Sequence, residues 1–142
     1  MPDSFRHEAL TAAPRSRVWQ RLQNPATWAT VAGVDGTSDH AYSGENLDGF
    51  RFRAVVGGIP YQGTARVTDS EPEGAMTMSI RSSELHGTIE VALYDEEGGT
   101  RLHVEMNVRP AGLLGPMVFP MISRSVRAGF PGSVERLAAE MD

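Results

Sequence analysis

The feature that most constrains the fold is the two-residue hydrophobic period that runs from Val34 to Arg109. Short turn sequences rich in Gly, Pro, Asp and Glu interrupt this period at regular intervals. The pattern predicts six strands, at about 34–43, 49–57, 60–69, 75–84, 87–95 and 100–109. Because the intervening turns are short, neighbouring strands are expected to pair as antiparallel hairpins.

Each of the clearest strands has one apolar and one polar face. In the last strand, Leu102 and Val104 alternate with His103 and Glu105. An antiparallel sheet of this kind leaves one face in water and needs a cover on the other. The cover has to come from outside the strands.

The C-terminal segment Ala111–Asp142 is the one segment long enough to be that cover. We expect a helix from about Leu114 to Met141, kinked at Gly129–Gly132 because Pro131 lacks a backbone donor. If that kink is a hinge, the first part of the helix opens as a gate; the alternative is a static kink that follows the curved sheet. The expected buried stripe at helical spacing consists of Leu114, Met117, Val118, Met121, Ile122, Ser125, Val126, Gly129, Phe130, Val134, Leu137, Ala138 and Met141.

The N-terminal part adds a strand and two short helices. Ser4–Ala12 alternates like a strand, and Pro14 suits the first turn of a helix that ends at Asn24. Pro25 starts a short second helix through Trp28. The predicted fold is α+β: a seven-stranded curved antiparallel sheet around a long C-terminal helix, with two short helices between strands 1 and 2. Residues 1–142 form a single domain.

This order of elements resembles the START-like superfamily, also called the polyketide cyclase, SRPBCC or helix-grip fold. Two structural motifs carry the likeness: Pro14-x-x-x-Val18-Trp19-x-x-Leu22-x-Asn24-Pro25, with Asn24 where Asp is more common, and Gly98-Gly99-Thr100-Arg101-Leu102. Within the superfamily, the stretches VVGGIPYQGTARVTD (55–69) and GLLGPMVFPMI (112–122) look most like the G subunits of carbon monoxide dehydrogenase. Those proteins often have Pro-Gly where this chain has Ala32-Gly33.

The resemblance implies a hydrophobic cavity between the sheet and the C-terminal helix. Members of the superfamily bind lipids, sterols, polyketides, quinones or hormones, and they share no catalytic residue that transfers by position. The expected function is therefore to bind or carry a bulky hydrophobic small molecule, such as a lipid, quinone or polyketide-like compound. Two alternatives stay open: a polyketide cyclase or dehydratase with an inward acid or base, and an accessory or interaction protein for a redox enzyme.

Candidate ligand contacts are apolar or aromatic side chains in the inward phase. Tyr61 is the strongest of them, because a buried phenol hydroxyl needs a hydrogen-bond partner. Methionine suits adaptable pockets, although it also fills gaps in ordinary cores. The full set is Phe50, Phe52, Tyr61, Met76, Met78, Met106, Met117, Met121, Ile122 and Phe130.

Catalytic signals are few. The sequence has none of the nucleophile, phosphate-loop, zinc-protease or dinucleotide motifs, so we expect no hydrolase, transferase or metal-dependent activity and no cofactor. Glu84 falls in the inward phase and, with Tyr61, is a candidate acid or base; alternatively it ends its strand in water. His103 shares the outward face with Glu105, which predicts a solvated face and no metal site.

Composition excludes several classes of partner and location. The chain has no Cys and a net charge of -5, which argues against a disulfide framework and a nucleic-acid partner. It lacks a signal-peptide pattern and the roughly 20 apolar residues of a spanning helix, so we expect a cytoplasmic protein. Arg124 and Arg127 flank the apolar stripe and leave a peripheral membrane contact open. Oligomeric state is not indicated.

Overall fold

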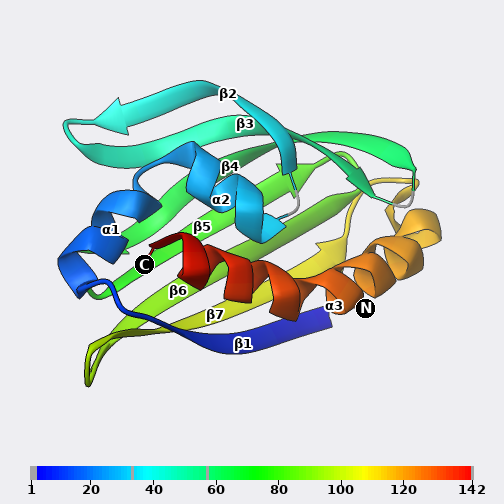
Figure 1. Cartoon of the computed structure of the whole chain (residues 1–142). Helices are drawn as coiled ribbons and strands as arrows, with labels where there is room; N and C mark the ends of the chain where they lie inside the picture. The colour runs from blue at the N-terminus through cyan, green and yellow to red at the C-terminus, as the bar shows by residue number, and fades with distance from the viewer. Residues whose placement is uncertain (1–2, 33, 57, 142) are drawn as a thin grey trace.

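One antiparallel sheet organises the chain in the computed structural model, which describes residues 3–32, 34–56 and 58–141. Within these residues the sheet has seven strands in the order β1-β7-β6-β5-β4-β3-β2 (Figure 1). Their bounds are β1 Asp3–Thr11, β2 Val34–Ser43, β3 Asn46–Val56, β4 Ile59–Glu71, β5 Ala75–Ser82, β6 Leu85–Glu96 and β7 Gly99–Pro110. This confirms the predicted seven-stranded sheet. Gly57, the end of the predicted strand 49–57, and Gly33 of the Ala32-Gly33 pair lie outside the described residues.

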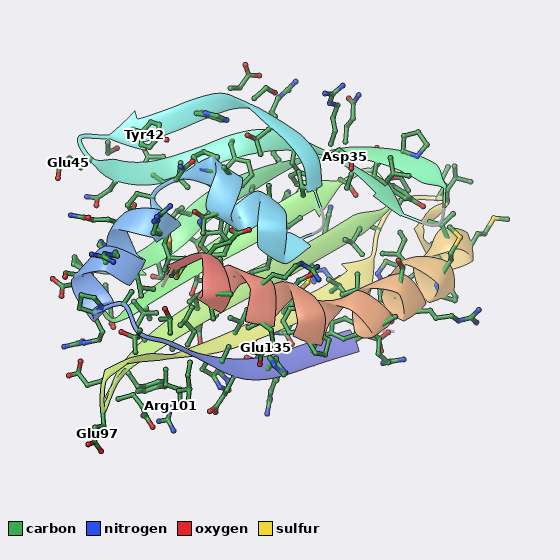
Figure 2. All side chains as sticks on the ribbon, viewed as in Figure 1. Asp35, Tyr42, Glu45, Glu97, Arg101 and Glu135 are labelled. Carbon is green, nitrogen blue, oxygen red and sulfur yellow. The ribbon has the colours of Figure 1, made fainter. Side chains whose placement is uncertain are left out.

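The strands from β2 to β7 form consecutive hairpins, as the short turn sequences predicted. Each of these strands pairs with its chain neighbour, and β1 returns to pair with β7, with Ala9 opposite Leu102. Gly44 and Gly98 sit in the two-residue turns at φ angles of 64° and 82°, a region that favours glycine. Glu45 and Glu97 project into solvent at these turns (Figure 2).

The three helices of the described residues lie on one face of the sheet (Figure 1): α1 Arg15–Leu22, α2 Pro25–Ala32 and α3 Gly115–Met141. The side-chain oxygen of Asn24 accepts the Ala26 N–H at 3.0 Å, and Pro25 occupies the first turn, which together start α2. The sequence predicted this helix only through Trp28, whereas it continues to Ala32.

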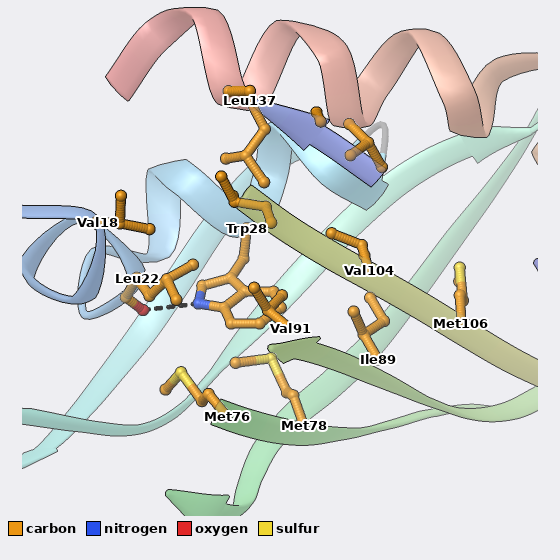
Figure 3. Packing of buried hydrophobic residues seen from close by; sticks show 14 of the residues in the cluster. Val18, Leu22, Trp28, Met76, Met78, Ile89, Val91, Val104, Met106 and Leu137 are labelled. Atoms are coloured by element: carbon orange, nitrogen blue, oxygen red, sulfur yellow. Dashed lines mark hydrogen bonds between the residues drawn. The ribbon is translucent and has the colours of Figure 1, made fainter. Parts of the chain in front are cut away.

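The core fills the space between this face and the helices. Trp28 is buried beside Met76, Met78 and Val91, and its Nε1–H donates to the Leu22 carbonyl at 2.7 Å (Figure 3). This bond joins α2 to the end of α1 and satisfies the one polar atom that the indole brings into the core. The predicted inward phase of the strands is confirmed here, since Ile89, Leu102 and Val104 are buried as well.

The long helix α3 continues without a break through Gly129–Gly132, where the sequence predicted a kink. Pro120 and Pro131 both lie inside it, and Figure 1 shows the helix changing direction near its middle. A bend of this kind is the usual consequence of an interior proline, which removes one helical hydrogen bond.

The predicted stripe of α3 is correct from Phe130 onward and only partly correct before it. Ile122 is buried and Val118, Met121 and Val126 are half-buried, whereas Ser125 and Gly129 are exposed. Leu137 and Met141 are buried, but Met117 is 77% exposed and Leu114 is 61% exposed. Phe119, which the stripe omitted, is buried instead. Nearly every residue from 113 to 122 is apolar, so the helical period alone does not show which of them faces the sheet.

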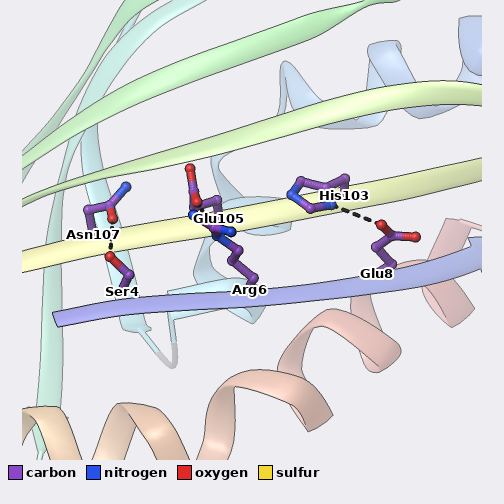
Figure 4. A network of polar contacts seen from close by, with 6 residues as sticks. All are labelled: Ser4, Arg6, Glu8, His103, Glu105 and Asn107. Carbon is purple, nitrogen blue, oxygen red and sulfur yellow. Dashed lines mark hydrogen bonds and ion pairs between the residues drawn. The ribbon is translucent and has the colours of Figure 1, made fainter.

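The outer face of β1 and β7 carries polar pairs (Figure 4). Ser4 donates to Asn107, Arg6 pairs with Glu105, and Nδ1 of His103 lies 3.2 Å from a carboxylate oxygen of Glu8. His103 is thus on the outward face, as the alternation predicted. Exposed pairs of this kind contribute little to stability, and their main effect is to keep the outer face hydrated.

Thr100 offers a test of how β7 is attached to the N-terminal part. Its side chain is fully buried, and its Oγ1–H donates to the Ala13 carbonyl at 2.7 Å. We expect Thr100→Val to lower the free energy of unfolding by about 1–3 kcal/mol, because that carbonyl loses its partner in a buried position. Urea denaturation measures the change. Thr88→Val on the exposed face is the control, and an equal effect of both variants would contradict this role.

Candidate functional site

A cavity lies between the inner face of the sheet, α2 and the first half of α3. The enclosed part of this cavity has a volume of about 80 Å³, which is enough for several water molecules or a small organic group. With the mouth that opens to solvent, the space free of protein atoms is about 730 Å³. The lining residues are Trp28, Val34, Phe50, Phe52, Ala54, Tyr61, Ala65, Met78, Ile80, Ser82, Leu85, Ile89, Met106, Ile122 and Val126.

Polar atoms in this lining are few, and all but one have partners. The indole nitrogen of Trp28 is bonded to Leu22. The hydroxyl of Ser82 donates to the Leu85 carbonyl at 3.3 Å and accepts the Leu85 N–H at 3.1 Å. The hydroxyl of Tyr61 is buried and has no hydrogen-bond partner in residues 3–32, 34–56 and 58–141. The cavity wall is therefore apolar except for one free hydroxyl.

Tyr61 enters the cavity from β4, where it pairs in register with Ala54 of β3. Its side chain is 8% exposed. Burial raises the pKa of the phenol above its ordinary value of 10.0, and the negative charge of Glu84 raises it further. The phenol is therefore protonated at neutral pH and available as a hydrogen-bond donor.

Glu84 lies in the turn between β5 and β6 and is half-buried. Its backbone carbonyl accepts the Ala111 N–H at 2.9 Å, which ties this turn to the segment that leads into α3. The sequence placed Glu84 either in the inward phase or at a strand end in water. The observed position is intermediate, since β5 ends at Ser82 while the carboxylate still acts on Tyr61.

The predicted ligand contacts fall into two groups. Those that the structure brings together in the cavity lining are Phe50, Phe52, Tyr61, Met78, Met106 and Ile122. The others lie elsewhere: Met76 is in the closed core, Met121 is half-buried outside the lining, and Phe130 packs against Phe5 with ring centroids 6.0 Å apart. Met117 points into solvent, which corrects its predicted inward position. Contact of any of them with a ligand stays a prediction.

Several lining residues were missing from the sequence prediction. Ala54, Ala65, Ile80 and Ile89 share the inward phase of the predicted residues, so the alternation itself was the signal for them. Trp28 and Val126 come from helices, and their place in the wall depends on how α2 and α3 cross the sheet. No pattern within either helix carries that information.

Contacts with β1 hold α3 on the side away from β3 and β4. Ser123 donates to the carboxylate of Asp3, and Arg127 lies 4.0 Å from the same carboxylate and over the Phe5 ring. Further along, Nε2 of His7 lies 2.8 Å from a carboxylate oxygen of Glu135. Both halves of α3 are thus attached to one sheet edge, while Ile122 and Val126 face the cavity.

The remaining histidines form no shared site. His40 is exposed on β2, with Nε2 2.8 Å from the Thr37 hydroxyl, and His86 is half-buried in β6. Among the residues that the structure describes, no three His, Asp or Glu side chains converge to hold a metal ion. In the same residues no helix is long and apolar enough to cross a membrane.

Comparisons with known proteins agree with this architecture. Residues 2–142 match the family model described as polyketide cyclase / dehydrase and lipid transport. No curated protein matches the sequence at a significant level. The fold is similar to that of the ZhuI aromatase/cyclase from Streptomyces sp. R1128, with 15% identity, a TM-score of 0.79, and coverage of 99% of this chain and 94% of that one.

Two further solved structures share the fold. A START superfamily protein from Mycobacterium smegmatis has 12% identity and a TM-score of 0.73, with coverage of 98% of this chain and 99% of that one. The Mll3558 protein from Rhizobium loti has 19% identity and a TM-score of 0.71, with coverage of 99% and 97%. None of the three is named as one of the G subunits of carbon monoxide dehydrogenase, so that finer resemblance stays a prediction.

The ionisation of Tyr61 gives a measurable signature. In the folded state the pKa of its phenol is raised, so between the unfolded and folded pKa values the unfolded chain loses a proton that the folded chain keeps. The free energy of unfolding should therefore fall as the pH rises above about 10. Tyr61→Phe should make this fall less steep, whereas Tyr42→Phe on the exposed β2 should not. Urea denaturation at a series of alkaline pH values measures it; superimposable slopes for wild type and Tyr61→Phe would contradict the raised pKa.

Proposed function

Because the chain belongs to the polyketide cyclase / dehydrase and lipid transport family, we propose that it binds or carries a bulky hydrophobic small molecule between the sheet and α3. The observation that carries the proposal is the apolar wall of the cavity. Ligand sites in proteins are concave and mostly apolar, with few polar groups that fix orientation. Here Tyr61 supplies the one hydroxyl of the lining that has no partner.

Filling the cavity with an apolar molecule is favourable for two reasons. The wall of Phe50, Met78 and Ile122 offers water no hydrogen bonds, so a hydrocarbon surface displaces water at a gain of about 25 cal/mol per Å² buried. The space also matches a modest ring system when the mouth is included. A larger ligand requires the first half of α3 to move away from β3 and β4.

Catalysis as a cyclase or dehydratase has one observation in its favour. The carboxylate of Glu84 is close enough to raise the pKa of the Tyr61 phenol, which makes an acid–base pair conceivable. A phenol with a raised pKa, however, donates a hydrogen bond more readily than it releases a proton. Since no second free polar group lines the cavity, binding is the better-supported function.

An interaction protein is the third class, and exposed apolar residues at the start of α3 favour it. Leu113, Leu114 and Met117 are 97%, 61% and 77% exposed. Isolated exposed apolar side chains are common on protein surfaces, whereas contiguous patches mark interfaces. These residues adjoin the first half of α3, so they also fit a segment that shields the cavity mouth.

Ligand entry can be tested with a neutral fluorescent probe that has no hydrogen-bond donor, 6-propionyl-2-(dimethylamino)naphthalene. We expect it to bind wild-type protein with an increase in emission and to lose about tenfold or more in affinity in Val126→Trp, because the indole fills the cavity. Val118→Trp is the matched control, since Val118 is also half-buried in α3 but does not line the cavity. Equal binding by both variants would contradict a site under α3.

The gate proposed for α3 can be tested by hydrogen exchange. If the bend is a hinge, amides in 115–128 should exchange faster than those in 133–141, and a bound probe should slow them. Ser123→Ala should speed this exchange further, because it removes the hydrogen bond to Asp3; the exposed Ser125→Ala is the control. If 115–128 exchange as slowly as the central strands with and without probe, α3 is a static cover.

A further inference from the structure

Tyr61 presents an unusual combination of burial and missing contact. Its side chain is only 8% exposed, it lines the cavity, and its hydroxyl has no hydrogen-bond partner within the described part of the chain. A buried hydroxyl without a partner is costly, so native structures pair nearly all of them with protein, water or ligand. The free hydroxyl therefore points to an atom that the protein itself does not supply.

The neighbours of Tyr61 on the inner face of the sheet are small residues and one aromatic ring. Ala54 lies opposite Tyr61 on β3, and Ala65 follows two inward positions later on β4; both line the cavity. Gly63 lies between Tyr61 and Ala65 on β4. A Cβ atom added at Gly63 would lie 2.6 Å from the Phe52 ring. Small residues thus flank Tyr61, and an aromatic ring forms the adjoining wall.

The surroundings also restrict the chemistry of the missing partner. An anionic group is disfavoured, because the carboxylate of Glu84 already acts on the phenol and would repel a second negative charge. An alcohol or amine would bring its own donor into the cavity, where the Ser82 hydroxyl is already bonded to the Leu85 backbone. An acceptor that has no donor of its own avoids both penalties.

We propose that the ligand presents a carbonyl oxygen, as in a ketone or quinone, to the Tyr61 hydroxyl, which donates the hydrogen bond that fixes its orientation. This inference rests on the proposed function and narrows its ligand class. The aromatic and methionine side chains of the wall hold the apolar body of the ligand. The phenol distinguishes a carbonyl compound from a hydrocarbon of the same shape.

A matched pair of probes tests the proposal: 1,4-naphthoquinone, which has two carbonyls, and naphthalene, which has none. The chain has no Cys and no Lys, so the quinone meets no reactive side-chain thiol or amine. Equilibrium dialysis against wild type, Tyr61→Phe and the exposed control Tyr42→Phe gives the affinities. We expect Tyr61→Phe to lower the affinity for the quinone about tenfold and to change that for naphthalene less than about twofold.

The outcomes separate the two proposals. If wild type binds neither probe, the proposed function fails together with this inference. If it binds both and Tyr61→Phe weakens them equally or not at all, only the carbonyl inference fails. Infrared spectra of the quinone bound to wild type give a second reading that needs no variant. The carbonyl band should move to lower wavenumber on binding, and an unmoved band would overturn the hydrogen bond.

Discussion

The structure depends on one constraint: a seven-stranded sheet with an apolar inner face has to be covered by a single long helix. The strands supply that face through strict alternation, as in Leu102, Val104 and Met106 of β7. Helices α1 and α2 cover one end of it, where Trp28 packs into the core. Everything else on this face depends on α3, because no other described element reaches it (Figure 1).

The cover is attached asymmetrically, and this asymmetry produces the cavity. Asp3 on β1 contacts Ser123 and Arg127, and His7 on the same strand contacts Glu135. On the opposite side, Ile122 and Val126 of α3 and Tyr61 of β4 line the same cavity. The closed part of the core lies under the second half of α3, where Val134 and Leu137 are fully buried. The open part lies under the first half.

The sequence predicted the sheet and its cover well because alternation and helical spacing are local patterns. It failed where a local pattern is uninformative. In the apolar run before Ile122, each residue fits a buried stripe, so Met117 was assigned inward although Phe119 takes that position. The cavity lining was predicted from strands, whereas Trp28 and Val126 depend on how the helices cross the sheet. Glu84 lies just beyond the end of β5, where the inward phase no longer determines a position.

Thr100 and Tyr61 show how differently two polar groups are accommodated in the same interior. Both hydroxyls are buried, but that of Thr100 is bonded to the Ala13 carbonyl, whereas that of Tyr61 has no partner among the described residues. A phenylalanine at position 61 would keep the ring packing and avoid an unpaired donor, which costs about 1–3 kcal/mol. Local violations of the rules for stable interiors are expected at functional sites. A buried hydroxyl without a partner, in a wall that is otherwise apolar, is therefore the observation that most favours the proposed ligand at this site.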